Sequence, residues 1–440
     1  MPSFKTKTTK NNASNLHQGT SNTPPRPKTS INDAIIEASF TTNPLNQPAN
    51  DAQSTDDKQP SKKPRTTGQK VFLVVIILLL IGLIVAIGVI IFLSIKSPDW
   101  NNKIDRVDYP DPIYSTLTGE EISDANLNNS PTYCVQIPNG PDGARPQAGL
   151  NQAAVVFEAI AESGITRFAA IFQNPTVSAI GPIRSLRPYY LNWDLPFNCT
   201  VVHAGGSDEA KDALIETGAR NLDENNNYMW REYGTDRGWN NLFTSTKDLA
   251  QFNSDNNYSS SNIQAFLHLT PEEVTAIQNE KLLCNESDNC VYNYLVPNFS
   301  ISFGANPFFN TSYVYNPETN TYSRFYANGD PHLTYSCPDG LSKPNTLIDC
   351  GEPIQITPSV VIAMFVQESL MSDNYHENIT TTGTGSAIVF QNGDAIEATW
   401  AKTSANSQII FRDTTGNELK FTPGQLWISA VPQQYGNVSY

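Results

Sequence analysis

The sequence predicts an α+β protein in which an N-terminal α/β module is followed by a mainly antiparallel β module. One transmembrane helix and a disordered tail precede both modules. Three observations support this prediction: an uncharged apolar run at 71–95, a strand, glycine-pair and helix pattern at 198–218, and alternating strands separated by turns after residue 312.

The uncharged run at 71–95 consists almost entirely of Val, Ile, Leu, Phe, Ala and Gly. A helix of about 20 apolar residues spans a bilayer core, and it satisfies its own backbone hydrogen bonds. The run is too long, and begins too late, for a cleaved signal peptide, so it predicts an uncleaved signal anchor. Basic residues precede it in excess, which predicts a cytoplasmic N-terminus and an extracytoplasmic chain after residue 96; these residues are Lys62, Lys63, Arg65 and Lys70.

Composition divides the rest of the chain around this run. Residues 1–70 contain too few apolar side chains to offset chain entropy, and they predict a disordered cytoplasmic tail. Residues 96–130 are rich in Asn, Asp and Pro and predict a juxtamembrane spacer, within which 112–122 is a candidate for the first ordered piece. The α/β module then occupies 131–283 and the β-rich module occupies 284–440.

Charge limits the classes of partner. The 440-residue chain has a net charge of −15, although residues 1–70 contain ten basic and only five acidic side chains. The extracytoplasmic part is therefore strongly acidic. Such a surface repels phosphate backbones, so no nucleic-acid partner is expected. Neutral or cationic partners fit it, unless a local group of arginines overrides the mean charge.

The α/β module is predicted from short apolar segments and from capping residues. The β-hairpin is expected from strands at 153–160 and 165–174, which flank a turn at 162–164. A strand ending in Gly205 and Gly206 leads into a helix that Ser207 caps and Gly218 ends. The remaining elements are a strand at 133–137, a helix from Pro188 and helices at 247–267 and 270–278.

The β-rich module is predicted from alternation and turn residues. Asn392-Gly393 between two alternating segments is a strong hairpin signal. Further strands are expected at 312–329 and 359–367, and hairpin-like turns at Thr415-Gly416 and Pro423-Gly424. The pattern indicates an antiparallel sheet or a small barrel.

All six cysteines follow the apolar run. An even number of cysteines in an oxidising compartment indicates disulfides, although six cysteines allow 15 connectivities. The closest pairs are Cys284–Cys290 and Cys337–Cys350, which leave Cys134–Cys199; six free thiols are the alternative. The chain has no C-x-x-C or H-x-x-x-H motif, so neither a metal site nor a cofactor is expected.

Several motifs resemble one bacterial family. They are ARPQAGLNQAAVVFEAIAESGITRFAAIFQ (144–173), IGPIRSLRPYY (180–190), VVHAGGS (201–207), GWNNLFTST (238–246) and the C-terminal run from GTGSAIVFQNGDAIEATWAK to FTPGQLWISAVP. These segments resemble the N- and C-terminal domains of the YerB-like lipoprotein family, the domain of unknown function 3048. The resemblance covers about residues 130–432. It implies a bacterial, extracytoplasmic, membrane-tethered protein, and it implies no activity.

The chain departs from this family at its anchor. Family members often begin with a lipobox whose cysteine is lipidated, whereas here no cysteine occurs in or after the apolar run before Cys134. The apolar helix itself is therefore the expected tether.

Four arginines suggest a ligand site within the acidic module. A guanidinium group binds carboxylate or phosphate in a bidentate fork. The alternative is a rigid network in which these arginines pair with Glu158, Glu162 and Asp194. The candidate ligand-binding arginines are Arg145, Arg167, Arg184 and Arg187.

The candidates for catalysis are weaker. Glu158 and Glu162 could act as acid and base if they approached each other, although Glu158 could equally pair with Arg167. His203 ends a strand before Gly205, Gly206 and Ser207, at the kind of edge where ligands bind to α/β units. A hydrogen-bonded core histidine and an ordinary serine cap are the alternatives.

These observations favour a single-pass, membrane-anchored envelope protein that binds a cell-wall glycan or an envelope protein rather than an enzyme. The alternative is an enzyme that acts on an anionic envelope glycan or phosphorylated substrate. In that case Arg145, Arg184 and Arg187 would bind the substrate, and Glu158, Glu162 or His203 would move protons.

Overall fold

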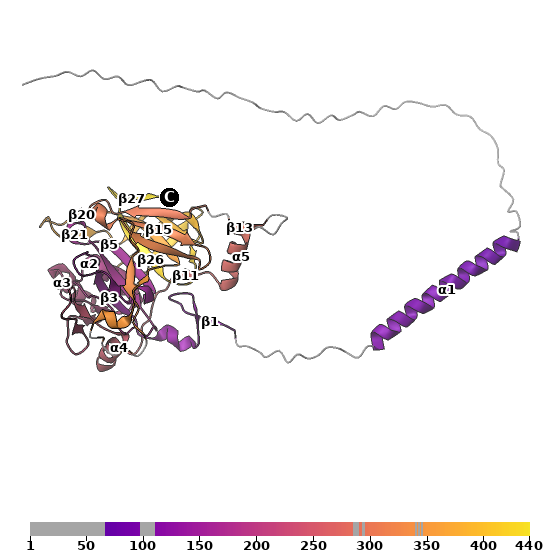
Figure 1. Ribbon diagram of the computed structural model, residues 1–440, viewed down its shortest axis with the longest axis horizontal. Coiled ribbons are helices and arrows are strands. Elements are labelled where there is room, and N and C mark those ends of the chain that lie inside the picture. The colour runs from indigo at the N-terminus through magenta and orange to yellow at the C-terminus, as the bar shows by residue number, and fades with distance from the viewer. Residues whose placement is uncertain are drawn as a thin grey trace, which may run out of the picture. The chain divides into compact units, whose positions relative to one another are not determined.

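A computed structural model describes residues 67–96, 111–284, 290–292, 295–338, 341, 344 and 346–440. The chain divides into two compact units, Met1–Arg106 and Val107–Tyr440, which are described separately here (Figure 1). Residues 1–66, and with them most of the predicted tail, lie outside the described residues.

The first unit contains one described helix, α1 (Thr67–Lys96), which has 30 residues. It begins a few residues before the predicted apolar run and ends one residue beyond it. Its described side chains from Leu78 to Val89 are all apolar or glycine, and those of residues 90–96 lie outside the described set. A search of the fully described residues finds no helix that is both long and apolar enough to cross a membrane.

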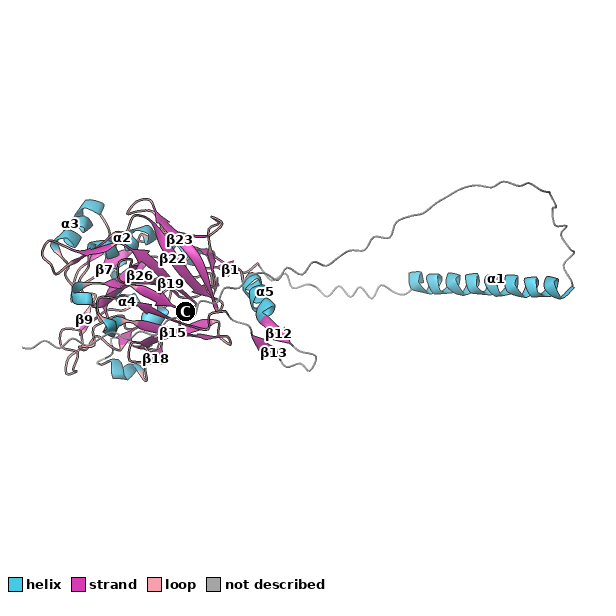
Figure 2. Cartoon of the chain, turned by 90° about the horizontal axis from the view of Figure 1, so that it is seen from above, coloured by secondary structure: helices cyan, strands magenta, loops and turns pink. Residues whose placement is uncertain are grey.

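The second unit is built on a mixed sheet of ten strands, seen from above in Figure 2. Most neighbouring strands are antiparallel, which agrees with the predicted α+β class. In spatial order the strands are β24 (Ile410–Asp413), β23 (Asp394–Lys402), β22 (Gly383–Gln391), β19 (Val360–Val366), β26 (Leu426–Pro432), β5 (Val155–Ile160), β6 (Thr166–Phe172), β3 (Tyr133–Pro138), β7 (Thr200–Val202) and β8 (Asn221–Leu222).

Strand β26 joins the two predicted modules. It runs parallel to β19 on one side and parallel to β5 on the other, with Val155 opposite Leu426. Seven residues of β26, all buried, lie in the middle of the sheet. The sequence boundary at residue 284 therefore divides the chain, whereas the sheet is continuous across it.

Layers cover both faces of this sheet. Apolar side chains of α2 (Pro188–Asp194) and α3 (Asp208–Thr217) pack on one face, together with Val155 and Phe157. The other face packs against α4 (Thr246–Asp255) and a four-stranded sheet (Figure 2). That smaller sheet has the order β16 (Thr321–Tyr326), β15 (Thr311–Asn316), β14 (Asn298–Ser302) and β27 (Asn437–Ser439).

Shorter elements complete the unit. A three-stranded sheet links β4 (Gln147–Ala148) in parallel to β17 (Leu333–Tyr335), which pairs with β18 (Ile354–Gln355). The remaining strand pairs are β1 (Ile113–Tyr114) with β2 (Glu121–Ile122), β9 (Trp230–Arg231) with β10 (Leu242–Phe243), β11 (Leu267–His268) with β25 (Lys420–Phe421), β12 (Leu282–Cys284) with β13 (Cys290–Tyr292), and β20 (Glu368–Leu370) with β21 (Glu377–Ile379). The last described helix is α5 (Pro271–Lys281), and 3₁₀ turns lie at Ala125–Asn129, Leu150–Gln152, Glu162–Gly164, Leu195–Phe197, Pro307–Phe309 and Leu347–Cys350.

The local signals in the sequence correspond to real elements. Ser207 accepts a hydrogen bond from Ala210 N at the start of α3, and Gly218 ends the helix with a left-handed φ of 62°. Residues 392 and 393 connect β22 to β23 with positive φ angles of 54° and 77°, as a type I′ hairpin turn requires.

Three local predictions need correction. The helix expected at 247–267 ends at Asp255, because the Asn- and Ser-rich segment after it has no apolar face to bury. The turn at Pro423-Gly424 does not close a hairpin, since β25 pairs with β11 whereas β26 enters the main sheet. Residues 111–130, assigned to the spacer, form β1, β2 and a 3₁₀ turn, and Leu117 is buried.

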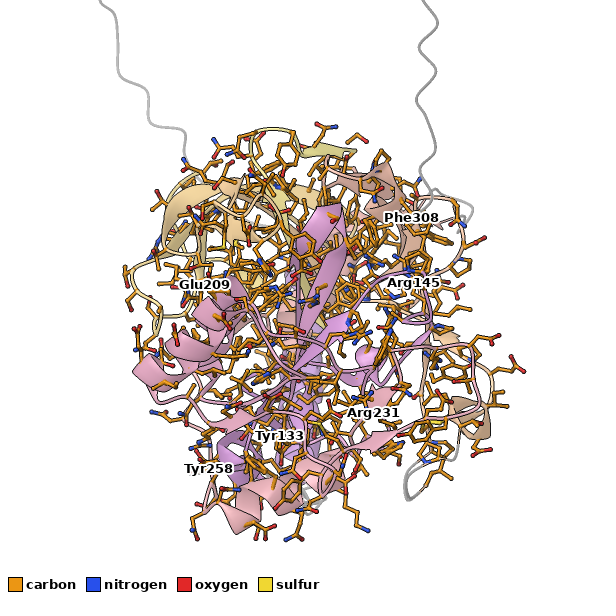
Figure 3. The ribbon with its side chains drawn as sticks, turned by 90° about the vertical axis from the view of Figure 1, so that its left-hand side faces the viewer. Tyr133, Arg145, Glu209, Arg231, Tyr258 and Phe308 are labelled. Atoms are coloured by element: carbon orange, nitrogen blue, oxygen red, sulfur yellow. A yellow bond between two sulfur atoms is a disulfide. The ribbon has the colours of Figure 1, made fainter. Side chains whose placement is uncertain are left out.

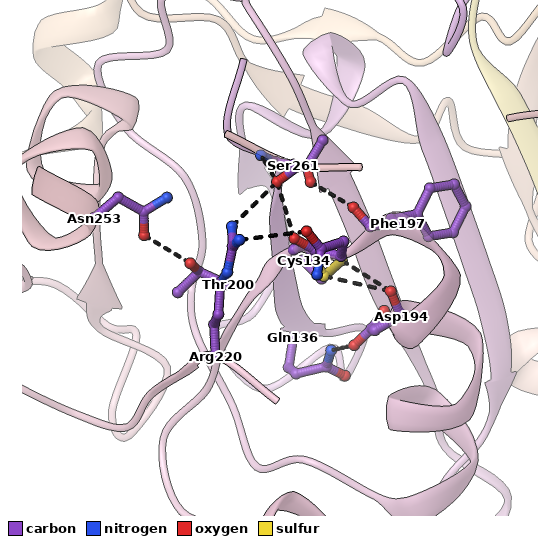
Figure 4. The surroundings of a disulfide bond; sticks show 11 residues. Cys134, Gln136, Asp194, Phe197, Thr200, Arg220, Asn253 and Ser261 are labelled. Carbon is purple, nitrogen blue, oxygen red and sulfur yellow. Dashed lines mark hydrogen bonds between the residues drawn. A yellow bond between two sulfur atoms is a disulfide. The ribbon is translucent and has the colours of Figure 1, made fainter. Parts of the chain in front are cut away.

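Two of the three predicted disulfides are present. Cys134–Cys199 ties β3 to the start of β7 (Figure 4), and Cys337–Cys350 joins two residues that are 13 positions apart in the chain. Cys284 and Cys290 lie directly opposite each other in the β12–β13 pair. Their side chains lie outside the described residues, so this third pairing stays a prediction.

Candidate functional site

The second unit has a surface cavity of about 720 Å³, within the size range of small-molecule sites. We call it the arginine cavity, because three guanidinium groups line it. Its walls come from the loop at 141–145, from Arg184, from the loop at 232–240 and from Tyr335, Leu347 and Ile348. Residues from both predicted modules therefore form it.

Arg145 lies at one end of the arginine cavity. Its Nε donates to Asn139 Oδ1 at 2.9 Å, and its guanidinium lies 3.9 Å from the ring centre of Tyr326. Figure 3 shows Arg145 beside Phe308, whose ring centre is 5.3 Å from the guanidinium. Burial lowers the pKa of Arg145 to about 10, so it stays a cation at neutral pH. Among the described residues, Nη2 has no hydrogen-bond partner.

Arg184 approaches the same cavity from the segment before α2. Its backbone N–H donates to Gln136 O, and its Nε donates to Asn240 Oδ1 at 2.9 Å. Asn240 in turn donates to Asp142 O, which fixes the amide in place. Burial, followed by the charge of Arg167, lowers the pKa of Arg184. The side chain is therefore a partly buried cation that is held by a neutral amide.

Arg237 has a different role, because a carboxylate neutralises it. Its Nε lies 2.8 Å from Glu232 Oε2, and its terminal nitrogens donate to Gly143 O and Pro146 O. Glu232 also accepts from Leu347 N at 2.8 Å. The pair therefore joins three separate loops and gives the cavity a rigid wall.

The rim of the arginine cavity combines an aromatic ring with free carboxylates. Trp239 is 81% exposed and Ile348 is 74% exposed, which is unusual for side chains of this size. Asp142 and Asp236 are exposed on the same rim. The loop at 232–240 was not predicted to be part of a site. Its signal was an arginine and a tryptophan within a segment of turn residues, YGTDRGWNN.

The other two candidate arginines do not reach this cavity. Arg167 Nη2 lies 3.0 Å from Glu162 Oε2, and Arg187 contacts Oε1 of the same carboxylate. Arg167 also donates to Ser185 O, and Arg187 donates to Leu186 O. Burial alone would raise the pKa of Glu162, but the charges of Arg167 and Arg187 outweigh it and lower the pKa. Glu162 therefore holds Arg167 and Arg187 together in a buried ion-pair cluster, which we call the clamp.

Glu158 is fully buried between the two sheets and does not pair with Arg167. Instead Arg324 Nη2 donates to both of its oxygens, at 3.0 and 2.9 Å. Trp427 Nε1 donates to Oε2 at 2.9 Å, and Thr166 Oγ1 donates to Oε1 at 3.0 Å. Glu158 and Glu162 are thus held by different arginines and do not form an acid–base pair.

The remaining candidates lie in the loop before α3. His203 is buried, with Nδ1 2.7 Å from Gly205 O and Nε2 2.7 Å from Asn221 Oδ1. Gly205 N donates to Asp223 Oδ1, and Ser207 caps α3. Gly206 contacts Leu186 through an isolated bridge. None of these residues lines the arginine cavity.

Two further points limit the chemistry of the site. Asp194, suggested as an arginine partner, instead accepts from Gln136 Nε2 at 2.9 Å, and burial raises its pKa well above the usual range (Figure 4). Within the described part of the chain, no group of three His, Cys, Asp or Glu side chains has the arrangement of a metal site.

The fold defines a class of two-module α+β domain, in which one sheet runs through both modules and an open arginine-lined cavity lies on its surface. Two family profiles match the chain: the N-terminal domain of a protein of unknown function (DUF3048) at residues 117–259, and the corresponding C-terminal domain at 299–428. The chain belongs to this family, as its motifs indicated.

A similar protein from Bacillus subtilis is found both by sequence and by structure. This protein, named "Putative lipoprotein YerB", is 28% identical over 323 residues, which cover 72% of this chain and 85% of that protein. The crystal structure of the YerB protein matches with a TM-score of 0.59 at 24% identity and covers 74% of this chain and 100% of that one. This structural likeness supports the fold alone.

Proposed function

We propose that this protein is a membrane-anchored, extracytoplasmic binding protein of the cell envelope, and that its arginine cavity holds an anionic ligand. The observation that carries the proposal is that Arg145 and Arg184, far apart in the sequence, line one open cavity with neutral hydrogen-bond partners. In an otherwise acidic domain, two such cations offer a local site for a carboxylate or phosphate group.

The anchor in this proposal is α1. A 30-residue α-helix extends about 45 Å, which exceeds the roughly 30 Å hydrocarbon core of a bilayer. The sequence of the helix is uncharged from 71 to 95, and its described side chains are apolar on every side. Such a surface favours lipid over water. The basic residues that precede it favour a cytoplasmic N-terminus.

Two disulfides support the extracytoplasmic location of the second unit. The Cys134–Cys199 and Cys337–Cys350 disulfides belong to the part of the chain that the topology puts outside, where oxidised cysteines persist. The relative named as a lipoprotein is consistent with tethering to a membrane. Here the apolar helix takes the place of a lipid.

Topology is tested by cysteine labelling in intact cells. A single cysteine introduced at Ser54, on the N-terminal side of α1, and another at exposed Ser404 are compared for reaction with a membrane-impermeant maleimide. We expect Ser404→Cys to react and Ser54→Cys to react only after lysis. Reaction of Ser54→Cys in intact cells would overturn the orientation.

Ligand binding is tested with the purified full-length chain in detergent, by calorimetry. The probes are a disaccharide of N-acetylglucosamine and N-acetylmuramic acid, which carries one carboxylate, and a short glycerol-phosphate oligomer. Arg184→Ala should weaken binding about tenfold or more, as expected when a hydrogen bond to a charged group is lost. Arg220→Ala is the matched control, because Arg220 lies away from the cavity and donates to Ser260 O.

The binding proposal fails if neither probe binds, or if Arg184→Ala and Arg220→Ala have equal effects. No observation favours the enzymatic alternative, since Glu158, Glu162 and His203 are all engaged in contacts away from the cavity.

A further inference from the structure

The arginine cavity is one end of a longer surface depression. A second hollow of about 410 Å³ shares Pro141 and Arg145 with it and is otherwise lined by residues such as Pro146, Pro331 and Leu333. A third hollow of about 610 Å³ shares Phe308, Tyr326 and Asn328 with the second. We call these the middle hollow and the far hollow. Because neighbouring hollows share lining residues, the three lie in a row on one surface, and we call this row the groove.

The chemistry of this groove changes along its length. The arginine cavity has three arginines and three acids, the middle hollow has Arg145 and Asp330, and the far hollow has no charged lining residue. The far hollow is instead lined by hydroxyl and amide side chains, namely Ser300, Asn310, Thr311, Ser312 and Asn328. An occupant of the whole groove therefore needs charge at one end and neutral polar groups at the other.

Aromatic side chains and unpaired polar atoms both occur among the residues that line the groove. Trp239 is exposed at the arginine end, and Phe308 (45% exposed) and Tyr326 stand between the middle and far hollows. Among the described residues, Tyr326 Oη, Asn310 Oδ1 and Thr235 Oγ1 are buried without a hydrogen-bond partner. Flat apolar faces next to unsatisfied polar atoms suit sugar rings, which present C–H faces and a rim of hydroxyl and amide groups.

A peptide strand is a poorer match for this groove. A peptide commonly adds to a sheet through an edge with free N–H and C=O groups. The edge strand beside the groove is β16, and its outward N–H groups are already used. Tyr322 N donates to Pro358 O, Arg324 N to Ile356 O and Tyr326 N to Asp330 O. No β-addition site remains along this edge.

Arg145, at the centre of the groove, is held in place by a network of buried hydrogen bonds. Asn139 accepts from Arg145 Nε and donates to Thr166 Oγ1 at 2.8 Å, and Thr166 donates to Glu158. Glu158 and Arg324 form the fully buried ion pair between the two sheets. Arg145 is thereby connected to the most buried polar network of the domain, which favours a fixed position over a mobile surface side chain.

We propose that the groove binds an extended polymer of N-acetylated sugars that carries carboxylates, with a carboxylate near Arg145 and Arg184 and neutral sugars in the middle and far hollows. This inference rests on the proposed function, and it adds the class of ligand and the direction in which the polymer lies.

The test measures affinity against chain length by calorimetry, with the full-length chain in detergent. The probes bear no peptides and contain two, four or six sugars, of which one terminal sugar is N-acetylmuramic acid and all others are N-acetylglucosamine. We expect the dissociation constant to fall at least about tenfold from two sugars to six, because longer probes reach the aromatic faces of further hollows. Equal affinity at all three lengths overturns the inference while leaving the proposed function intact.

Two variants test the contributions of the two ends of the groove separately. Ser312→Tyr fills the far hollow without touching Arg145, so it should remove the gain from six sugars and leave the disaccharide unchanged. Trp239→Ala should weaken every length by a similar factor. Tyr375→Ala is the matched control, since Tyr375 is a 53% exposed aromatic residue outside the groove.

Three results would overturn the inference even if the disaccharide binds. They are an unchanged affinity of Ser312→Tyr for the hexasaccharide, an equal loss for Tyr375→Ala and Trp239→Ala, and binding of a sugar-free wall peptide as tightly as the hexasaccharide. If only the glycerol-phosphate oligomer binds, the inference is overturned and the proposed function stands; if neither probe binds, the proposed function itself fails.

Discussion

Arg167 and Arg187 share one carboxylate as their partner, whereas Arg145 and Arg184 have neutral hydrogen-bond partners. Glu162 is the shared partner in the first region, and the three side chains are about nine-tenths buried. In the second region the partners are amide oxygens of Asn139 and Asn240, and the guanidinium groups line an open cavity. The same residue type thus supports the fold in one place and is available to a ligand in another.

The contrast follows from the cost of burial. A buried cation requires an opposite charge, because the desolvation penalty is otherwise several kcal/mol. Partial exposure of a guanidinium group to solvent reduces this desolvation penalty. A neutral amide is therefore a sufficient partner for Arg145 and for Arg184. Removing the partner should therefore be most damaging where burial is deepest.

The largest effect is expected at Glu158. Glu158→Ala leaves Arg324 fully buried without a counter-charge and removes the acceptor of Trp427, so the free energy of unfolding should fall by about 3–5 kcal/mol. Denaturant unfolding followed by tryptophan fluorescence measures this. Glu397→Ala, at an exposed position of β23, is the control. A loss below about 1 kcal/mol would show that the burial argument is wrong.

The next effect is expected at Glu162. Glu162→Gln should cost about 2 kcal/mol, because one of the two acceptor oxygens becomes an NH2 donor and the other loses its charge. Glu224→Gln, whose pair with Arg231 is more exposed, should cost less than about 1 kcal/mol. Similar losses for the two variants would contradict the distinction between a buried clamp and a surface pair.

Glu162 also predicts a pH dependence with a definite sign. Its folded pKa lies below the ordinary value of 4.5, so its contribution to stability is complete above that value and is lost as pH falls through the folded pKa. Acid unfolding of the wild type should therefore steepen below pH 4.5, and Glu162→Gln should lack this component. Parallel acid-unfolding curves for the two proteins would refute this assignment.

Glu377 predicts a pH dependence of stability with the opposite sign. Burial and the neighbouring Glu368 raise its pKa to about 9, and Tyr435 contacts the Glu368 carboxylate. Because the protonated form is the favoured one, stability is complete below the unfolded pKa and is lost as pH rises through about 9. Thermal unfolding from pH 7 to pH 10 should show the decline in the wild type and a smaller one in Glu377→Gln. An unchanged decline in the variant would exclude Glu377 as its source.

The smallest effect on stability is expected at Arg184. Arg184→Ala should change the free energy of unfolding by less than about 1 kcal/mol, since it removes one hydrogen bond to a neutral amide. Arg187→Ala, three residues away, should cost about 2 kcal/mol, because Glu162 loses one of its two cations. Equal losses for these two variants would remove the basis for separating the two kinds of arginine.

The sequence predicted local structure better than the site. The capped helix α3, the Asn392-Gly393 hairpin and the Cys337–Cys350 loop depend on residues close together in the chain. The Glu158–Arg324 pair joins residues 166 positions apart, and no local spacing indicates it. Its weak signal was an arginine at an inward position of the alternating segment TYSRFY.

The groove was not predicted from the sequence, because segments that are far apart in the chain form it. Arg145 and Arg184 were identified because arginines are conspicuous in an acidic domain, but the loop at 232–240 and the residues around Phe308 and Tyr326 were not associated with them. Pairing of β17 with β4, which brings the second half of the chain to this place, is parallel and long-range. Hydrophobic alternation specifies a strand, and it does not specify which distant strand lies beside it.

The central place of β26 has a consequence for the order of events during biosynthesis. Strands β5, β6, β3, β7 and β8 are made first, yet β5 keeps an unpaired edge until residues 426–432 have emerged. Most of the domain must therefore be synthesised before the sheet can close, and the exposed edge of β5 is open to pairing with other chains during that interval. A nascent chain of this kind would benefit from a chaperone that covers the edge until β26 arrives.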